Sequence, residues 1–195
     1  MILAYHSVFS AYGFWLPNDP RGSWSDFVRS WDLVRFGKAT KVAVGHSVAR
    51  VEHNIAERLR AKRSLRYPPV AFTGPQARAV GRGFAQAVAE GKYVLHACSI
   101  LPEHVHVVIA RHERDVERIV GHLKARATQR LKAEGLHPLA ACGPGDGGLP
   151  SPWGRRGWNG FLDDPQHLRN AVRYVEQNPV REGKVEQRWS FVTPL

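Results

Sequence analysis

Cysteine is scarce in this chain, and its placement argues against two kinds of protein. The two cysteines, Cys98 and Cys142, lie far apart, and neither belongs to a Cys-x-x-Cys pair. A small domain held together by disulfides, or a zinc site built from thiolates, is therefore not expected. A reducing compartment fits this cysteine usage best.

Long apolar runs are missing as well. No stretch reaches the roughly 18 apolar residues that a membrane-spanning helix needs. Residues 1–6 lack both the basic start and the apolar run of a secretory signal. From the sequence we therefore expect a cytoplasmic protein that has no membrane partner.

Acidic residues are few compared with basic ones. The chain has 28 Lys and Arg against 17 Asp and Glu, which gives a net charge of +11 at pH 7 and a pI of about 10.3. This charge favours polyanionic partners and salt-sensitive association, although it does not determine the fold. We expect a nucleic acid as the partner, with a merely solvated basic surface as the alternative.

The apolar content, by contrast, is sufficient for a folded core. Hydrophobic residues make up 43% of the 195 residues and include six tryptophans, so global disorder is not expected. Because a chain of this length fits one folding unit, we predict a single domain over residues 1–195.

Hydrophobic periodicity predicts the strands and helices of this domain. The expected strands are residues 2–10, 92–100, 104–111 and 155–162. The expected helices are residues 51–65, 75–90, 113–134 and 165–178, with Pro179 ending the last one. Glycine and proline are concentrated in residues 137–152, which we expect to form a loop.

The order of these elements predicts an α+β fold. A strand is followed by a helix, a hairpin, a helix, a strand and a final helix, which is typical of a ferredoxin-like antiparallel sheet with helices packed on it. About residues 17–73 stand between the first strand and the first core helix. We expect these residues to form an N-terminal helical insertion.

Two histidines in the predicted hairpin form the first candidate site. His104 and His106 are two residues apart on one strand, so their side chains share a face about 7 Å apart and can converge on one cation. Val105, Val107 and Ile109 alternate to the other face, which we expect to pack on helices while the histidines face outward. A pair of surface histidines is the alternative, because a short His-x-His pattern is weak evidence alone.

A tyrosine and an asparagine in the last predicted helix form the second candidate site. Tyr174 and Asn178 are four residues apart, so they lie on one helix face. A phenol there can meet a phosphate while the carboxamide oxygen reaches a metal. The alternative is a half-buried helix aromatic followed by an asparagine that caps the helix before Pro179.

Taken together, the two sites resemble a known family. The segment LPEHVHVV at residues 101–108 and the segment YVEQNPVREG at residues 174–183 resemble the single-tyrosine HUH transposases. The Asn-Pro-Val-Arg ending is most similar to the branch associated with repeated extragenic palindromes (REP). Residues 12–24 also resemble a subset of these transposases that has a longer N-terminal region.

The resemblance implies a role for each matching residue. His104, His106 and Asn178 would hold Mg²⁺ or Mn²⁺, with Gln177 as the alternative third ligand, and Tyr174 would be the nucleophile. The implied activity is cleavage and rejoining of single-stranded DNA, often hairpin-tipped, through a 5′-phosphotyrosine. Two alternatives stay open: a non-catalytic DNA-binding protein derived from a transposase, and a metal-dependent hydrolase that uses water.

Basic and aromatic side chains are candidates for contact with the DNA, with solvated helix faces and core aromatics as the alternatives. These candidates are Arg58, Arg60, Lys62, Arg63, Lys124, Arg126, Arg155, Arg156 and Trp158. The resemblance leaves the oligomeric state open, since compact relatives act as homodimers and the palindrome-associated branch is monomeric.

Overall fold

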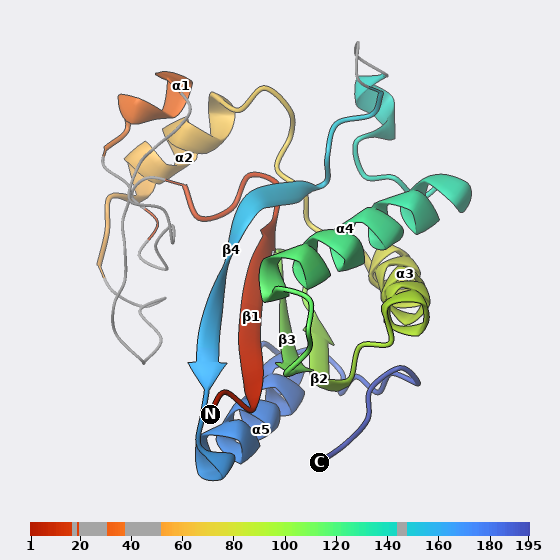
Figure 1. Cartoon of the computed structure of the whole chain (residues 1–195). Helices are drawn as coiled ribbons and strands as arrows, with labels where there is room; N and C mark the ends of the chain where they lie inside the picture. Colours follow the sequence, from red (N-terminus) through yellow and green to blue (C-terminus); the bar gives the residue numbers. More distant parts are fainter. Residues whose placement is uncertain (17–18, 20–30, 38–51, 144–147) are drawn as a thin grey trace.

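The protein contains a four-stranded antiparallel sheet with helices on both faces (Figure 1). The computed structural model describes residues 1–16, 19, 31–37, 52–143 and 148–195. Its strands are β1 (Ala4–Ala11), β2 (Leu95–Ile100), β3 (His104–Ala110) and β4 (Trp153–Leu162). Its longer helices are α3 (Gly74–Gly91), α4 (Val116–Ala133) and α5 (Pro165–Arg181).

The topology confirms the predicted fold class. In chain order the core elements are β1, α3, β2, β3, α4 and β4, and the strands lie in the sheet in the order β2-β3-β1-β4. Every paired strand is antiparallel to its neighbour. This β-α-β-β-α-β arrangement is the ferredoxin-like fold. All four predicted strands are present, with bounds that differ from the expected ones by a few residues.

Helices α3 and α4 cover one face of the sheet and form the main core with it (Figure 1). Val105, Val107 and Ile109 point into this core, as their alternation predicts. Helix α4, predicted at residues 113–134, has an apolar stripe that is buried: Val116, Ile119, Val120, Leu123, Ala127 and Leu131.

Two interior glycines let α3 approach its neighbours closely. A Cβ atom on Gly83 would lie 2.5 Å from the Ala127 Cα of α4, and one on Gly81 would lie 2.3 Å from the Trp189 ring. The helix nevertheless forms, because Thr73 and Gln76 cap its first turn reciprocally. Glycine here therefore serves helix packing at the expense of intrinsic helix propensity.

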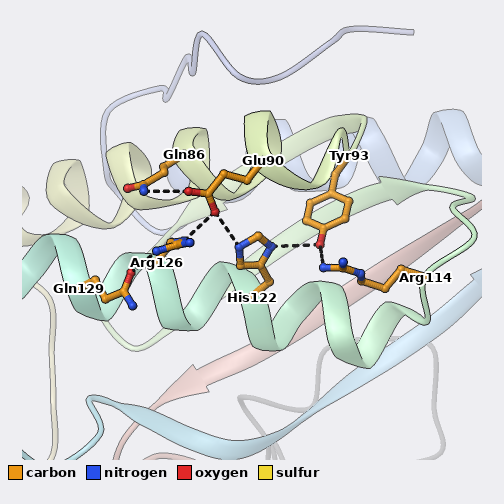
Figure 2. Close-up of polar contacts among 7 residues, drawn as sticks. All are labelled: Gln86, Glu90, Tyr93, Arg114, His122, Arg126 and Gln129. Atoms are coloured by element: carbon orange, nitrogen blue, oxygen red, sulfur yellow. Dashed lines mark hydrogen bonds and ion pairs between the residues drawn. The ribbon is translucent and has the colours of Figure 1, made fainter.

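A surface network fastens α3 to α4 (Figure 2). Glu90 of α3 accepts hydrogen bonds from Arg126 at 2.7 Å and Gln86 at 2.9 Å, and it lies 3.0 Å from His122 Nε2. The other nitrogen of His122 lies 3.0 Å from the Tyr93 hydroxyl, and Arg114 donates to that hydroxyl. These contacts reinforce the apolar core along its edge.

Helix α5 covers the opposite face. Asp164 caps its first turn by accepting from the backbone N–H groups of Gln166 and His167. Val172 and Val175 then pack on a second apolar cluster with Ala4, Ala97 and Val108. The cap at Asp164 and the start at Pro165 confirm the predicted beginning of this helix.

The predicted end of the last helix is wrong. Pro179 lies inside α5, which continues to Arg181. A proline this close to a helix end removes a single hydrogen bond, the one that its missing N–H would donate to the Val175 carbonyl. The backbone N–H of Glu182 still bonds to the Asn178 carbonyl at 3.1 Å, so the turn closes.

Among the residues described between β1 and α3, two helices are present, as predicted for a helical insertion. They are α1 (Trp31–Val34) and α2 (Ile55–Arg63). The expected helix at residues 51–65 included a stripe of Val51, Ile55 and Leu59; Val51 lies outside the described residues. Ile55 is 55% exposed and Leu59 is 44% exposed, so this stripe does not form a core.

Contacts with the turn after β1 attach α2 to the domain. The Lys62 ammonium lies 4.3 Å from the centre of the Phe14 ring, and the Tyr12 and Tyr67 rings meet edge to face at 6.1 Å. At the other end of the chain, Val192 bridges to Leu95 alongside β2. No helix within the described part of the chain is long and apolar enough to cross a membrane.

Candidate active site

The predicted histidine pair lies beneath α5. His104 and His106 share one face of β3, and their rings are 4.9 Å apart between centres. The expectation that they face outward is wrong, since His106 is only 7% exposed. Strand alternation separates the two faces correctly, but it does not reveal that a helix from the end of the chain covers the second face.

A third histidine, His6, joins this pair from β1. Its Nε2 lies 3.1 Å from Nδ1 of His106, and the two ring centres are 5.3 Å apart. No motif in the sequence singled out His6. Since His6 lies two residues after Ala4 on β1, strand alternation puts the two side chains on one face of the sheet. Only the register of β1 against β3 brings His6 beside His106.

Tyr174 of α5 contacts the histidines from the side of the sheet that α5 covers. Its ring centre lies 5.6 Å from that of His106 and 5.9 Å from that of His6. The side chain is 38% exposed, so one part contacts the histidines while another is open to solvent. Partial burial raises the pKa of the Tyr174 phenol, and the Arg181 guanidinium, 5.5 Å from the ring centre, opposes that rise.

One turn later, Asn178 is also buried. It is 6% exposed, and its Nδ2 atom has no hydrogen-bond partner among the described residues. Gln177, the alternative third ligand, is exposed, and its Oε1 accepts a hydrogen bond from Arg181 at 2.8 Å. Because the Gln177 oxygen is exposed and already accepts from Arg181, whereas Asn178 is buried on the same helix face as Tyr174, Asn178 fits a ligand role better than Gln177.

Burial favours the neutral form of the His6 and His106 imidazoles. Burial lowers the pKa of His6 to about 4, and burial together with the neighbouring His104 and His6 lowers the pKa of His106 well below its usual value. A neutral imidazole has one nitrogen lone pair, which is the form that binds a metal. At the edge of the site, a carboxylate oxygen of Glu182 lies 3.8 Å from His104 Nε2.

These donors fit a small divalent cation. In the described part of the chain, His, Cys, Asp and Glu provide no group of three that could hold a metal. A cation would therefore need the Asn178 carboxamide in addition to His104 and His106. Mixed nitrogen and oxygen ligation with open positions suits a catalytic cation better than a structural zinc.

Two tryptophans flank the histidines. The Trp158 ring on β4 meets His6 edge to face at 5.5 Å, and the Trp15 ring lies 6.3 Å from His104. Trp15 has a φ of 59°, in the left-handed region that non-glycine residues rarely adopt. The turn after β1 thus holds an aromatic ring beside the site. Trp153, in contrast, is buried in the core at 4% exposure.

Basic residues at the end of α2 and just after it line a separate cavity. It has a volume of about 460 Å³, and Lys62, Arg63, Arg66 and Tyr67 lie in its wall. Arg60 is instead paired with Glu57, and the guanidinium Nε of Arg58 is buried. The cavity combines three cations with an aromatic ring.

The other predicted DNA contacts divide into two groups. Arg155 on β4 is exposed, whereas the side chain of Arg156 lies outside what the structure describes. Lys124 does not lie on an exposed face, because its ammonium donates to the Gly154 carbonyl at 3.0 Å and lies 5.0 Å from the centre of the Phe9 ring. Arg126 is bound to Glu90. Lys124 and Arg126 therefore contribute to packing.

Comparison with known proteins gives matches among solved structures. No family model matches this sequence, and no curated protein matches it either. A REP-associated tyrosine transposase bound to a REP hairpin has a TM-score of 0.49 and 14% identity, over 97% of this chain and 74% of that one. A candidate transposase from Deinococcus radiodurans R1 has a TM-score of 0.41 and 12% identity, over 91% of each chain. This chain is thus similar in structure to two proteins described as transposases.

Proposed function

We propose that this protein cuts and rejoins single-stranded DNA as a metal-dependent, single-tyrosine transposase. The observation that carries the proposal is the contact between the Tyr174 ring and the His106 and His6 rings. Residues from three distant parts of the chain, the first strand, the hairpin and the last helix, thereby form one polar site. Asn178 adds a buried amide on the same helix face as Tyr174.

The proposed reaction is a transesterification. The Tyr174 oxygen attacks the scissile phosphorus, the bond from phosphorus to the 3′ oxygen breaks, and a 5′-phosphotyrosine and a 3′-hydroxyl result. The phenolic proton leaves to solvent, and the departing 3′ oxygen takes up a proton. Because one phosphodiester replaces another, a 3′-hydroxyl of a second strand can reverse the step without ATP.

The phenol needs assistance, because its pKa is ordinarily about 10 and partial burial raises the pKa of Tyr174 further. His104, His106 and Asn178 would hold Mg²⁺ or Mn²⁺. When bound, such a cation neutralises charge on the scissile phosphate and on the attacking oxygen. The partial exposure of Tyr174 leaves room for a single strand to approach, whereas duplex stacking would hinder an in-line attack.

The DNA strand itself is expected to run over Trp158 beside the site and over the separate basic cavity at the end of α2. Trp158 borders His6, so its ring is placed for base stacking. The α2 cavity can hold a phosphate between Lys62 and Arg63. Replacing both cations with alanine should lower the salt dependence of DNA binding by about one unit of slope for each phosphate that is no longer neutralised. An unchanged salt dependence would show that this cavity does not contact the DNA.

The decisive experiment is a covalent trapping assay. A hairpin-tipped single-stranded oligonucleotide, labelled on the 3′ side of the cut, is incubated with the protein and Mn²⁺ and run on a denaturing gel. Wild type should give a protein–DNA adduct, and Tyr174→Phe, which removes one hydroxyl, should give none. Binding without an adduct in wild type would indicate a non-catalytic protein. Cleavage by Tyr174→Phe without an adduct would indicate a hydrolase that uses water.

A further inference from the structure

We propose that His6 is a positioning residue that fixes the tautomer of His106. In this arrangement His106 donates its Nδ1–H to Nε2 of His6, and the lone pair on Nε2 of His106 is then available to a divalent cation. The inference rests on the proposed function, because it assigns a second role within the same site.

The short distance between the two rings carries the argument. The 3.1 Å from His6 Nε2 to His106 Nδ1 is a hydrogen bond, and one of the two nitrogens must carry its proton. If His6 is the donor, His106 keeps its own proton on Nε2 and offers no lone pair there. If His106 is the donor, its Nε2 is free. Metal binding through Nε2 therefore requires His6 to be the acceptor.

The surroundings of the pair favour a fixed arrangement. The Trp158 and Tyr174 rings both meet His6 edge to face, at 5.5 Å and 5.9 Å. His106 is 7% exposed, so solvent offers its Nδ1 little alternative. A buried ring nitrogen without a partner is costly. His6, as the acceptor, thus determines both the rotamer and the tautomer of the His106 imidazole.

The geometry assigns His6 to the support of the site rather than to direct ligation. Its Nε2 is the nitrogen that faces His106, so this atom is already engaged. A residue that hydrogen-bonds to a metal-ligating histidine typically affects metal affinity by roughly 10- to 100-fold. This magnitude is measurable with the metal alone, in the absence of DNA.

The test is a Mn²⁺ titration of the full chain, with free Mn²⁺ followed by electron paramagnetic resonance. Four variants are compared with wild type: His106→Ala, His6→Ala, His6→Gln and His6→Asn. Glutamine places its Oε1 the same number of bonds from Cβ as Nε2 of histidine, whereas asparagine is one bond shorter. The asparagine variant is thus the matched control, because it keeps the amide but is too short to reach His106.

We expect His106→Ala to abolish binding and His6→Ala to raise the Kd by roughly 10- to 100-fold. His6→Gln should recover most of the affinity, and His6→Asn should not. Equal affinity of His6→Ala and wild type would overturn the inference, as would equal affinities of the alanine, glutamine and asparagine variants. If His106→Ala binds Mn²⁺ like wild type, the proposed metal site itself is wrong, and the two failures are thereby distinguished. Thermal unfolding without metal shows whether each variant is folded.

Discussion

The two faces of the sheet bury very different side chains. Under α3 and α4 the face is apolar, and its alternating valines and isoleucine pack on two helices. Under α5 the face combines a small apolar cluster with His6, His104 and His106. Burial of apolar area stabilises the first face, whereas burial of neutral polar rings on the second costs free energy that their mutual hydrogen bond only partly offsets.

The difference indicates that the α3 and α4 layer serves mainly stability, whereas the α5 layer serves mainly the candidate site. The layer of α3 and α4 is fastened by its core and by the network around Glu90. In the α5 layer, a smaller apolar cluster that includes Val172 and Val175 holds Tyr174 over the histidines. Substitutions on the first face should therefore change stability, and substitutions on the second should change chemistry.

The largest expected effect is on the second face. His106→Ala should abolish formation of the DNA adduct, since it removes a proposed metal ligand, while leaving much of the salt-dependent DNA binding, which arises from phosphate contacts. Its effect on stability should be moderate, about 1–3 kcal/mol, because it removes the hydrogen bond to His6 and leaves that buried nitrogen without this partner. Adduct yield, filter binding and urea unfolding measure these three quantities. Retained cleavage would show that His106 is not a ligand.

The opposite pattern is expected on the first face. Leu123 is fully buried between α4 and the sheet. Leu123→Ala should lower the free energy of unfolding by about 2–5 kcal/mol, because it removes buried methyl groups and leaves a cavity. The variant should still form the adduct at low temperature, where it is folded. A loss of adduct in the folded variant would contradict the separation of the two faces.

A smaller effect is expected at Lys124, a cation on the first face whose pKa is lowered by burial to about 8. Between pH 8 and the unfolded pKa of about 10.4, the unfolded chain binds more protons than the folded one. Stability should therefore rise with pH in this window, by on the order of 1–3 kcal/mol. Below pH 8 both states are protonated and the cost of burial is constant.

The matched variant is Lys124→Met, which keeps most of the length of the stem and removes the charge. Urea unfolding between pH 7 and 10.5 should show a rise for wild type and a flatter profile for the variant. Parallel profiles would mean that another group causes the rise. The ammonium also donates to the Gly154 carbonyl, so the variant lacks that one hydrogen bond at every pH.

Hydrophobic periodicity predicted the strands and helices well where their formation depends on residues close together in the chain. The α4 stripe, the alternation of β3 and the capped start of α5 depend on neighbours in the chain, and all three are confirmed. The exposed Ile55 and the continuation of α5 through Pro179 went against expectation, because each depends on what surrounds the element rather than on its own sequence.

The sequence by itself determined which residues are candidates for chemistry and which face of each element they occupy. His104 with His106, and Tyr174 with Asn178, follow from periods of 2 and 3.6 residues. Only the tertiary structure decided that these two faces meet, and that His6 lies against His106 at 3.1 Å. The physical reason is that strand register and helix docking are set by packing over the whole core, which no local pattern contains.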